Sequence, residues 1–182
     1  MEGADYICVI RVIRRYSFAM PAKRRTKTPH ADRPNNPGYG IEETTKGLLP
    51  WRWAEQRLSK TQNYFLATVR DDGRPHVMPI WGVWTEGRFY FSSGKKSVKA
   101  RNLSKNPNCV LCPGDADEAL ILEGRVSRIS DRKTLGKFVS VYKKKYDFDP
   151  STMNEPVFVI QPKVAFGQIE ETFPKTATRW RF

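Results

Sequence analysis

One segment of the sequence combines the residue types that hold an anion. Between Glu86 and Asp115 there is no acidic residue, but there are six basic ones: Arg88, Lys95, Lys96, Lys99, Arg101 and Lys105. Five of the six fall within residues 95–105, next to Ser92, Ser93, Gly94 and Ser97. Hydroxyl groups, a flexible glycine and free N–H groups at a helix start, surrounded by cations, make a suitable cradle for a phosphate. A solvated basic helix is the alternative interpretation.

The preceding strand, predicted over residues 75–85, is apolar on both faces. Alternation places Val77, Pro79, Trp81 and Val83 on one face and Met78, Ile80, Gly82 and Trp84 on the other. A barrel strand ordinarily buries one face, so the second needs a partner subunit, a flat aromatic ligand, or both. Pro79 removes a backbone donor, which suits an edge or bulge facing a ligand. A central strand between barrel and helix is the alternative.

Other catalytic patterns are weak. Cys109 and Cys112 form a Cys-x-x-Cys, but an apolar strand surrounds them and few further ligands exist, so we predict no metal site. His76 fits a strand residue beside a turn better than a catalyst. The sequence has no Walker-type phosphate loop and no Ser/His/Asp grouping, and we identify no catalytic side chain.

The elements that must position these residues follow from hydrophobic periodicity. We expect helices over residues 51–62 and 99–105 and from Asp131 to about Tyr146. Strands are expected over 63–70, 75–85, 89–92, 108–112, 119–129, 156–161 and 164–169, with a turn at 71–74 and a polar tail ending at residues 178–182. Six or seven short strands with two or three helices predict a mainly β, antiparallel, barrel-like fold.

The composition divides the chain of 182 residues into a tail and one domain. The net charge is +13, of which residues 1–46 contribute nine basic and five acidic residues, or +4. The prolines and glycines of residues 21–46 exclude regular structure there, so we predict a basic, disordered tail over 1–46 and a domain over 47–182. Three cysteines cannot form a disulfide framework, and the N-terminus does not fit a secretory signal, so we expect a cytoplasmic protein.

Three segments carry a resemblance to a known family. They are LLPWRWAE at 48–55, DGRPHVMPIWGVW at 72–84 and KARNLSKNP at 99–107, with TRWRF at 178–182 as a fourth, weaker match. Residues 48–182 resemble the pyridoxamine 5′-phosphate oxidase-like split β-barrel proteins, and more narrowly the actinobacterial group that uses the deazaflavin coenzyme F420. The resemblance implies an FMN-binding type of split barrel with Greek-key topology.

The resemblance also implies a homodimer with the cofactor, F420 or alternatively FMN, at the subunit interface. Residues carried over to the phosphate are Ser92, Lys96, Ser97, Lys99 and Arg101. The backbone of Met78, Pro79 and Ile80 would border the ring, and Trp180 would close the pocket. The implied reaction is hydride transfer from a reduced deazaflavin to a small organic acceptor with an activated C=C bond.

Other functions remain open from the sequence. An FMN-dependent oxidase or reductase on the same fold is the nearest, and a protein that binds a flavin or F420 without turnover is another. A nucleic-acid binder would use the basic tail and the lysine-rich helix after Asp131, but the aromatic residues lie in apolar strands rather than between the cations. We therefore expect neither nucleic acid nor a membrane as a partner.

Overall fold

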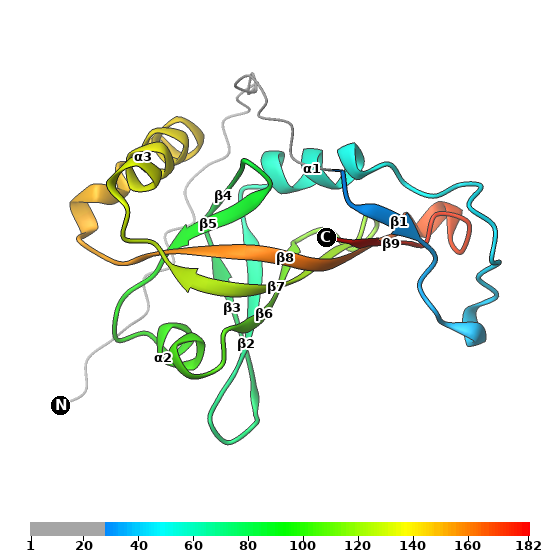
Figure 1. Cartoon of the computed structure of the whole chain (residues 1–182), viewed down its shortest axis with the longest axis horizontal. Helices are drawn as coiled ribbons and strands as arrows, with labels where there is room; N and C mark the ends of the chain where they lie inside the picture. The colour runs from blue at the N-terminus through cyan, green and yellow to red at the C-terminus, as the bar shows by residue number, and fades with distance from the viewer. Residues whose placement is uncertain (1–27) are drawn as a thin grey trace.

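A computed structural model describes residues 28–182 of the chain (Figure 1). The strands are β1 (His30–Asp32), β2 (Tyr64–Val69), β3 (Pro75–Ile80), β4 (Val83–Thr85), β5 (Arg88–Ser92), β6 (Asn108–Pro113), β7 (Leu120–Arg128), β8 (Val157–Gly167) and β9 (Thr178–Arg181). The α-helices are α1 (Trp51–Lys60), α2 (Val98–Lys105) and α3 (Arg132–Tyr146). Short 3-10 helices are η1 (Pro37–Tyr39), η2 (Pro150–Met153) and η3 (Glu170–Thr172).

The strands form one antiparallel sheet that curls into a barrel. Its order is β1-β9-β8-β7-β6-β2-β3, and β5 joins β8 to β4. Strands β3 and β4 are therefore at the two ends of the series β3-β2-β6-β7-β8-β5-β4, although they are consecutive in the chain. Residues 81–82 join them in the chain. The mainly β, antiparallel split barrel predicted from the sequence is confirmed, and β3 is an edge strand of it rather than a central one.

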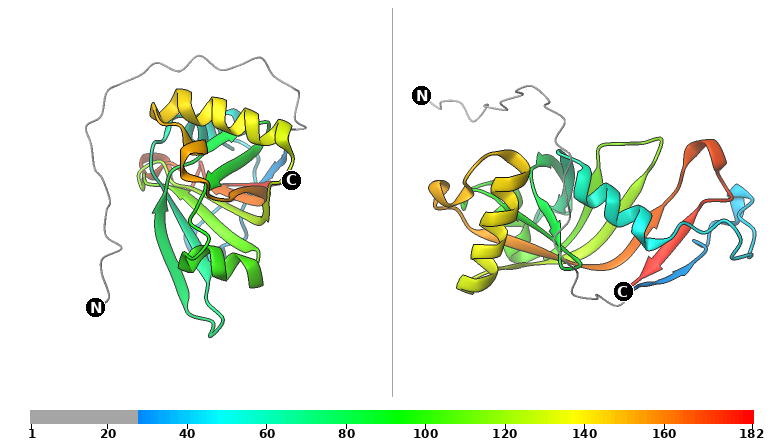
Figure 2. Two further views of the ribbon diagram at one scale, coloured as in Figure 1. Left: turned by 90° about the vertical axis from the view of Figure 1, so that its left-hand side faces the viewer. Right: turned by 90° about the horizontal axis from the view of Figure 1, so that it is seen from above.

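Local sequence signals set the helix boundaries. The side chain of Asp131 accepts hydrogen bonds from the backbone N–H groups of Lys133 and Thr134 and so caps α3. Ser97 caps α2 by accepting from Ala100 N. In Figures 1 and 2, α3 and α2 lie on opposite sides of one end of the barrel, and α1 lies on the same side as α3. The hairpin of β2 and β3 projects past α2.

The core has two parts separated by the sheet. The larger part fills the barrel and includes Leu58 of α1, Tyr64, Leu66, Phe89, Leu111 and Trp180. The smaller part lies under α3 and includes Val83, Tyr90, Phe138, Tyr142, Val157 and Val159. Because α3 covers the outer side of β4 and β5, both faces of these short strands are buried.

Three strand predictions need correction. The predicted strand 75–85 is interrupted at Trp81 and Gly82, where a Cβ on Gly82 would lie 2.6 Å from Tyr90 O. The two strands predicted at 156–161 and 164–169 form one strand, β8, because a register shift between Glu123 and Gly124 of β7 accommodates Pro162. The expected polar tail at the C-terminus contains β9, which pairs with β8.

The N-terminal segment also differs from the prediction. Residues 30–32 form β1, paired with β9, so the prolines around them do not exclude regular structure. Asp32 accepts from Nε and Nη2 of Arg179, at 2.8 and 3.0 Å, and these hydrogen bonds lower the pKa of its carboxyl group. Arg33 donates to four carbonyl oxygens, those of Thr44, Lys46, Lys175 and Ala177, at 2.6–2.8 Å. Part of the predicted tail is thus attached to the barrel; residues 1–27 lie outside the described residues.

Candidate functional site

The loop between β5 and α2 brings Ser93 and Ser97 together. Ser97 Oγ lies 3.0 Å from Ser93 Oγ, and Ser97 N donates to Gly94 O at 3.0 Å. Ser92 Oγ donates to Pro156 O at 3.3 Å, which turns this hydroxyl toward the end of β8. Ser97 therefore lies at the start of α2, which begins one residue earlier than the predicted helix, whereas Ser92 is engaged with the neighbouring strand β8.

Lys99 is the cation of this segment whose surroundings are unusual. Its side chain is half-buried, burial lowers the pKa of its amine, and no carboxylate of residues 28–182 forms an ion pair with it. The charge of Lys99, with that of Arg70, also acts on His76, whose pKa is lowered first by burial and then by these two cations. A half-buried cation without a counterion is costly unless an anion is bound beside it.

His76 belongs to a hydrogen-bonded group that ties α2 to the sheet. Its Nδ1 lies 3.5 Å from Thr68 Oγ1, directly across the β2–β3 register. Thr68 Oγ1 accepts from Asn102 Nδ2 of α2 at 3.0 Å, and both residues are buried. These contacts tie α2, the helix that carries Lys99, to the β2–β3 hairpin. Sequence reasoning set His76 aside and missed Asn102, although the position of His76 opposite Thr68 follows from the hairpin turn.

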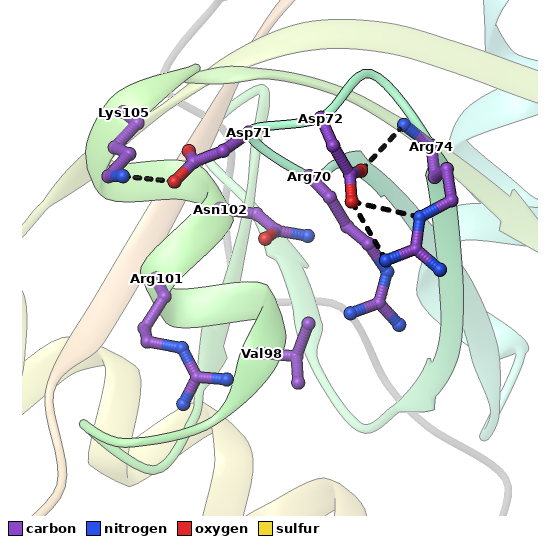
Figure 3. A pocket seen from close by; sticks show the side chains of 8 residues that line it. All are labelled: Arg70, Asp71, Asp72, Arg74, Val98, Arg101, Asn102 and Lys105. Carbon is purple, nitrogen blue, oxygen red and sulfur yellow. Dashed lines mark hydrogen bonds and ion pairs between the residues drawn. The ribbon is translucent and has the colours of Figure 1, made fainter.

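A groove of about 260 Å³ runs between α2 and the β2–β3 turn. Figure 3 shows its lining: Arg70, Asp71, Asp72, Arg74, Val98, Arg101, Asn102 and Lys105. Asp71 pairs with Lys105, and Asp72 pairs with Arg74, so two of its four cations are neutralised within the groove. Of the residues predicted for the phosphate, Arg101 alone lines it, and its Nη1 donates to Lys96 O at 2.6 Å. Lys96 itself is exposed.

Strand β3 leaves its apolar side chains open. Val77 is 53% and Met78 42% exposed, and Pro79 is exposed as well. Ile80 is buried, so only its backbone can border a ligand. The expectation that both faces of this strand are covered is not met within one chain, because β3 ends the sheet.

Trp180 does not close a pocket. Its side chain is 0% exposed, in the centre of the barrel core, and packs between Trp51 and Trp53. The predicted pocket-closing role of Trp180 is wrong because the C-terminal segment is a sheet strand, β9, and not a loose tail. The indole of Trp180 fits in the core because Gly167 of β8 has no side chain; a Cβ at that position would lie 2.6 Å from Trp180.

A second unusual lysine was missed. Lys145 Nζ donates to Tyr64 OH at 2.8 Å and to Gly82 O at 2.9 Å, and burial lowers the pKa of this amine to about 7. It lies 4.8 Å from the Tyr64 ring centroid and 5.2 Å from that of Tyr146. The signal was present, because Lys145 follows Phe138 by seven residues and Tyr142 by three and so falls on the apolar face of α3.

The Cys-x-x-Cys of the sequence lies within strand β6. On β6, Cys109 points into the core and Cys112 to the other face, and burial raises the pKa of the Cys109 thiol to about 12. Residues 28–182 contain no group of three His, Cys, Asp or Glu side chains that could hold a metal ion. Within the same range, no helix has the length and apolar character needed to cross a membrane.

Comparison with known proteins agrees with this architecture. Residues 54–168 match the pyridoxamine 5′-phosphate oxidase family. The chain belongs to this family. A search of curated proteins finds no match to this chain.

Solved structures of several different proteins share its fold. An F420 reductase is 26% identical, with a TM-score of 0.51 over 61% of this chain and 94% of that one. HutZ, a heme storage protein from Vibrio cholerae, is 16% identical, with a TM-score of 0.52 over 60% and 87%. A NimC/NimA family protein from Clostridium acetobutylicum is 15% identical, with a TM-score of 0.58 over 72% and 92%. The last two demonstrate the common fold and nothing about activity.

Proposed function

We propose that this family member is an F420-dependent oxidoreductase that reduces an activated C=C bond of a small organic acceptor. The observation that carries the proposal is Lys99, a half-buried cation without a carboxylate partner among residues 28–182, beside the apolar edge strand β3. An anionic group bound at Lys99 would supply the missing counterion.

The residues around Lys99 fit the phosphate of a deazaflavin. Ser93 and Ser97 offer hydroxyls at the start of α2, and Arg101 adds a second charge on the same helix. Arg70 also contributes positive potential, since its charge reaches His76. Together these groups would bind the anionic end and hold the cofactor in one orientation along β3.

The open side of β3 fits the flat ring. Met78 is exposed, and it lies on the same face of the sheet as the buried side chains of Leu66 and Tyr64 on β2. A ring bound over this face would therefore contact apolar groups. Pro79 has no backbone N–H, so this part of the edge strand offers one hydrogen-bond donor fewer. A bound reduced deazaflavin supplies the hydride. The protein's part is to position the acceptor and exclude water, and a proton from solvent or a site side chain completes the reduction.

We further propose that the active form is a homodimer. The outer face of β2 and β3 is apolar and open, with Phe65 48%, Val69 38% and Val77 53% exposed. Ala67 lies between them, across from Val77, and Ile121 extends the apolar surface to β7. Surfaces of this kind in a single chain are typical of protein interfaces, and a second copy would cover β3 and enclose the cofactor.

Two arguments favour F420 over FMN. Of the three solved structures described above, the F420 reductase alone shares more than 25% of its aligned residues with this chain, and the alignment covers 94% of the reductase. The cations in the groove next to Lys99 would also suit the additional carboxylates of the F420 tail. FMN on the same fold is the competing reading, and the titration below separates the two.

The test is a titration of the full chain with F420 and with FMN, followed by intrinsic tryptophan fluorescence. We expect Lys99→Ala to weaken F420 binding about 10- to 100-fold, because one charge-assisted hydrogen bond is lost. Lys133→Ala, which removes an exposed lysine at the start of α3, is the matched control and should bind normally. Unchanged affinity in Lys99→Ala would refute the anion site, and micromolar FMN binding without F420 binding would replace the cofactor assignment.

A further inference from the structure

The hydrogen-bond partners of Lys145 match those of an uncharged amine. Its Nζ donates to Tyr64 OH at 2.8 Å and to Gly82 O at 2.9 Å. The Tyr64 hydroxyl gives its own hydrogen to Leu58 O at 2.6 Å, and a carbonyl oxygen only accepts, so neither partner donates to the amine. An uncharged amine has two N–H groups, one for each acceptor, and its lone pair then remains available for bond formation.

The groups in contact with this amine carry no charge near neutral pH. They are the backbone at Gly82, Tyr64 of β2 and Tyr146 of the same helix, whose ring centroids lie 4.8 and 5.2 Å from Nζ. The pKa values of both tyrosines are raised, first of all by burial. Burial also lowers the pKa of the Lys145 amine to about 7, against the weaker attraction of the two rings for a cation. A desolvated, uncharged lysine is a nucleophile.

The exposure of Lys145 limits the size of an electrophile that could react with it. The side chain is half-buried in the last turn of α3, which lies on the outside of the barrel (Figure 1). Lys143 and Lys144, the two residues before it, are exposed. A small reagent can therefore reach all three amines, whereas a bulky one is hindered at Lys145. Contacts in the fold, and not the sequence, set one of three consecutive lysines apart.

We propose that Lys145 is an acylation site that accepts the acyl group of a small acyl phosphate. In this step Nζ forms a bond to the acyl carbon and the C–O bond to the phosphate breaks. Phosphate leaves with the electron pair of that bond, and the amine proton passes to solvent. The amide product is uncharged, like its surroundings, whereas a carbamate formed with carbon dioxide would place a negative charge among neutral groups. The amide N–H still donates to one of the two acceptors, Tyr64 OH or Gly82 O.

The expected rate advantage follows from the uncharged fraction of the amine. At pH 7.5 about three quarters of an amine with a pKa of about 7 is uncharged, against about 0.1% for an exposed lysine with the ordinary value of 10.5. A weaker base is also a weaker nucleophile, which offsets about 50-fold of this difference on the Brønsted relation that thiols follow. An advantage of about 10-fold remains for Lys145.

The test is treatment of the full chain with acetyl phosphate at pH 7.5, 8 and 9. Chymotryptic digestion and tandem mass spectrometry then locate the acetyl group among Lys143, Lys144 and Lys145, which lie on one peptide between Tyr142 and Tyr146. The two exposed neighbours are thus matched controls in the same digest. The measurement uses no cofactor, so its outcome is independent of the proposed function.

We expect Lys145 to be acetylated about 10-fold faster than Lys143 or Lys144 at pH 7.5. Between pH 8 and 9 its rate should change less than about 2-fold, because the amine is already uncharged, whereas the rates of its neighbours should rise about 10-fold. In the urea-unfolded chain all three rates should agree within about 2-fold, because the contacts are gone. Lys145→Arg should remove the fast reaction from this peptide, and Lys144→Arg should leave it.

Three results would overturn the inference. A Lys145 rate equal to those of Lys143 and Lys144 at pH 7.5 would show that the amine is charged or out of reach. A rise of about 10-fold between pH 8 and 9 would show that Lys145 titrates as an ordinary lysine. A fast reaction that persists in urea would assign the rate to the local sequence and not to the contacts with Tyr64 and Gly82.

Discussion

Replacing Lys145 by methionine should remove a pH dependence from the stability of the protein. The amine is enclosed by the rings of Tyr64 and Tyr146, and burial lowers its pKa from the ordinary 10.5 to about 7. No carboxylate within the described range pairs with it. The charged form is therefore disfavoured in the folded chain, and the cost is greatest below pH 7.

The sign follows from proton binding in the two states. Between pH 7 and 10.5 the unfolded chain keeps the Lys145 proton while the folded chain has released it, so the free energy of unfolding rises with pH. One pH unit in this window corresponds to about 1.4 kcal/mol, so the wild type should gain about 2 kcal/mol between pH 7 and pH 9. The pKa values of both neighbouring tyrosines are raised, so in the folded chain they stay protonated over this range.

Lys145→Met keeps the length of the side chain and leaves both acceptors with other partners. Tyr64 OH still donates to Leu58 O at 2.6 Å, and Gly82 O still lies 2.9 Å from the Tyr146 hydroxyl. We therefore expect the variant to be at least as stable as the wild type at pH 7, with this advantage decreasing by about 2 kcal/mol by pH 9.

The assay is urea denaturation followed by far-UV circular dichroism at pH 7, 8 and 9. Lys133→Met, an exposed lysine of the same helix, is the control and should show the wild-type pH dependence. If Lys145→Met and the wild type change in parallel between pH 7 and 9, Lys145 does not titrate in this window and the reasoning is refuted.

Two further predictions concern packing and assembly. Gly82→Ala places a Cβ 2.6 Å from Tyr90 O and should cost about 1–3 kcal/mol in thermal unfolding, whereas Gly136→Ala, whose Cβ meets nothing within 4 Å, should not destabilise; equal melting temperatures would contradict this. Val77→Asp puts a charge on the apolar outer face and should convert the proposed dimer to a monomer in sedimentation velocity, whereas Met153→Asp, exposed on η2, should not. A dimeric Val77→Asp would place the interface elsewhere.

Much of the local structure could be predicted because its causes are local. Asp131 marks the start of α3 by capping it, and the turn at residues 71–74 sets the register of β2 and β3. The cap and the turn each depend on a few consecutive residues, and alternation then indicates which side chains of a strand share a face. Proximity of Ser97 and Lys99 also follows, because both lie in the first turn of one helix.

The remaining assignments depended on which strands become neighbours. Trp180 is a core residue because β9 pairs with β8, a strand of 11 residues, and so brings Trp180 against Trp51 and Trp53 of α1. Residues 30–32 are ordered because β9 offers them a free edge, which no property of the N-terminal sequence reveals. Pairings between segments so distant in sequence leave no local pattern.

The sequence by itself determined a mainly β, antiparallel barrel and a basic segment after the third strand, since periodicity and charge are properties of the chain. Only the tertiary structure decided which of those cations is partly buried without a carboxylate partner among residues 28–182. Six basic residues are equivalent in the sequence, but folding half-buries Lys99 near His76 and leaves Lys96 and Arg101 exposed. It also places Lys145 among tyrosines and leaves β3 at an open edge. Burial and the absence of a counterion are set by neighbours in space, and so they cannot be read from composition or spacing.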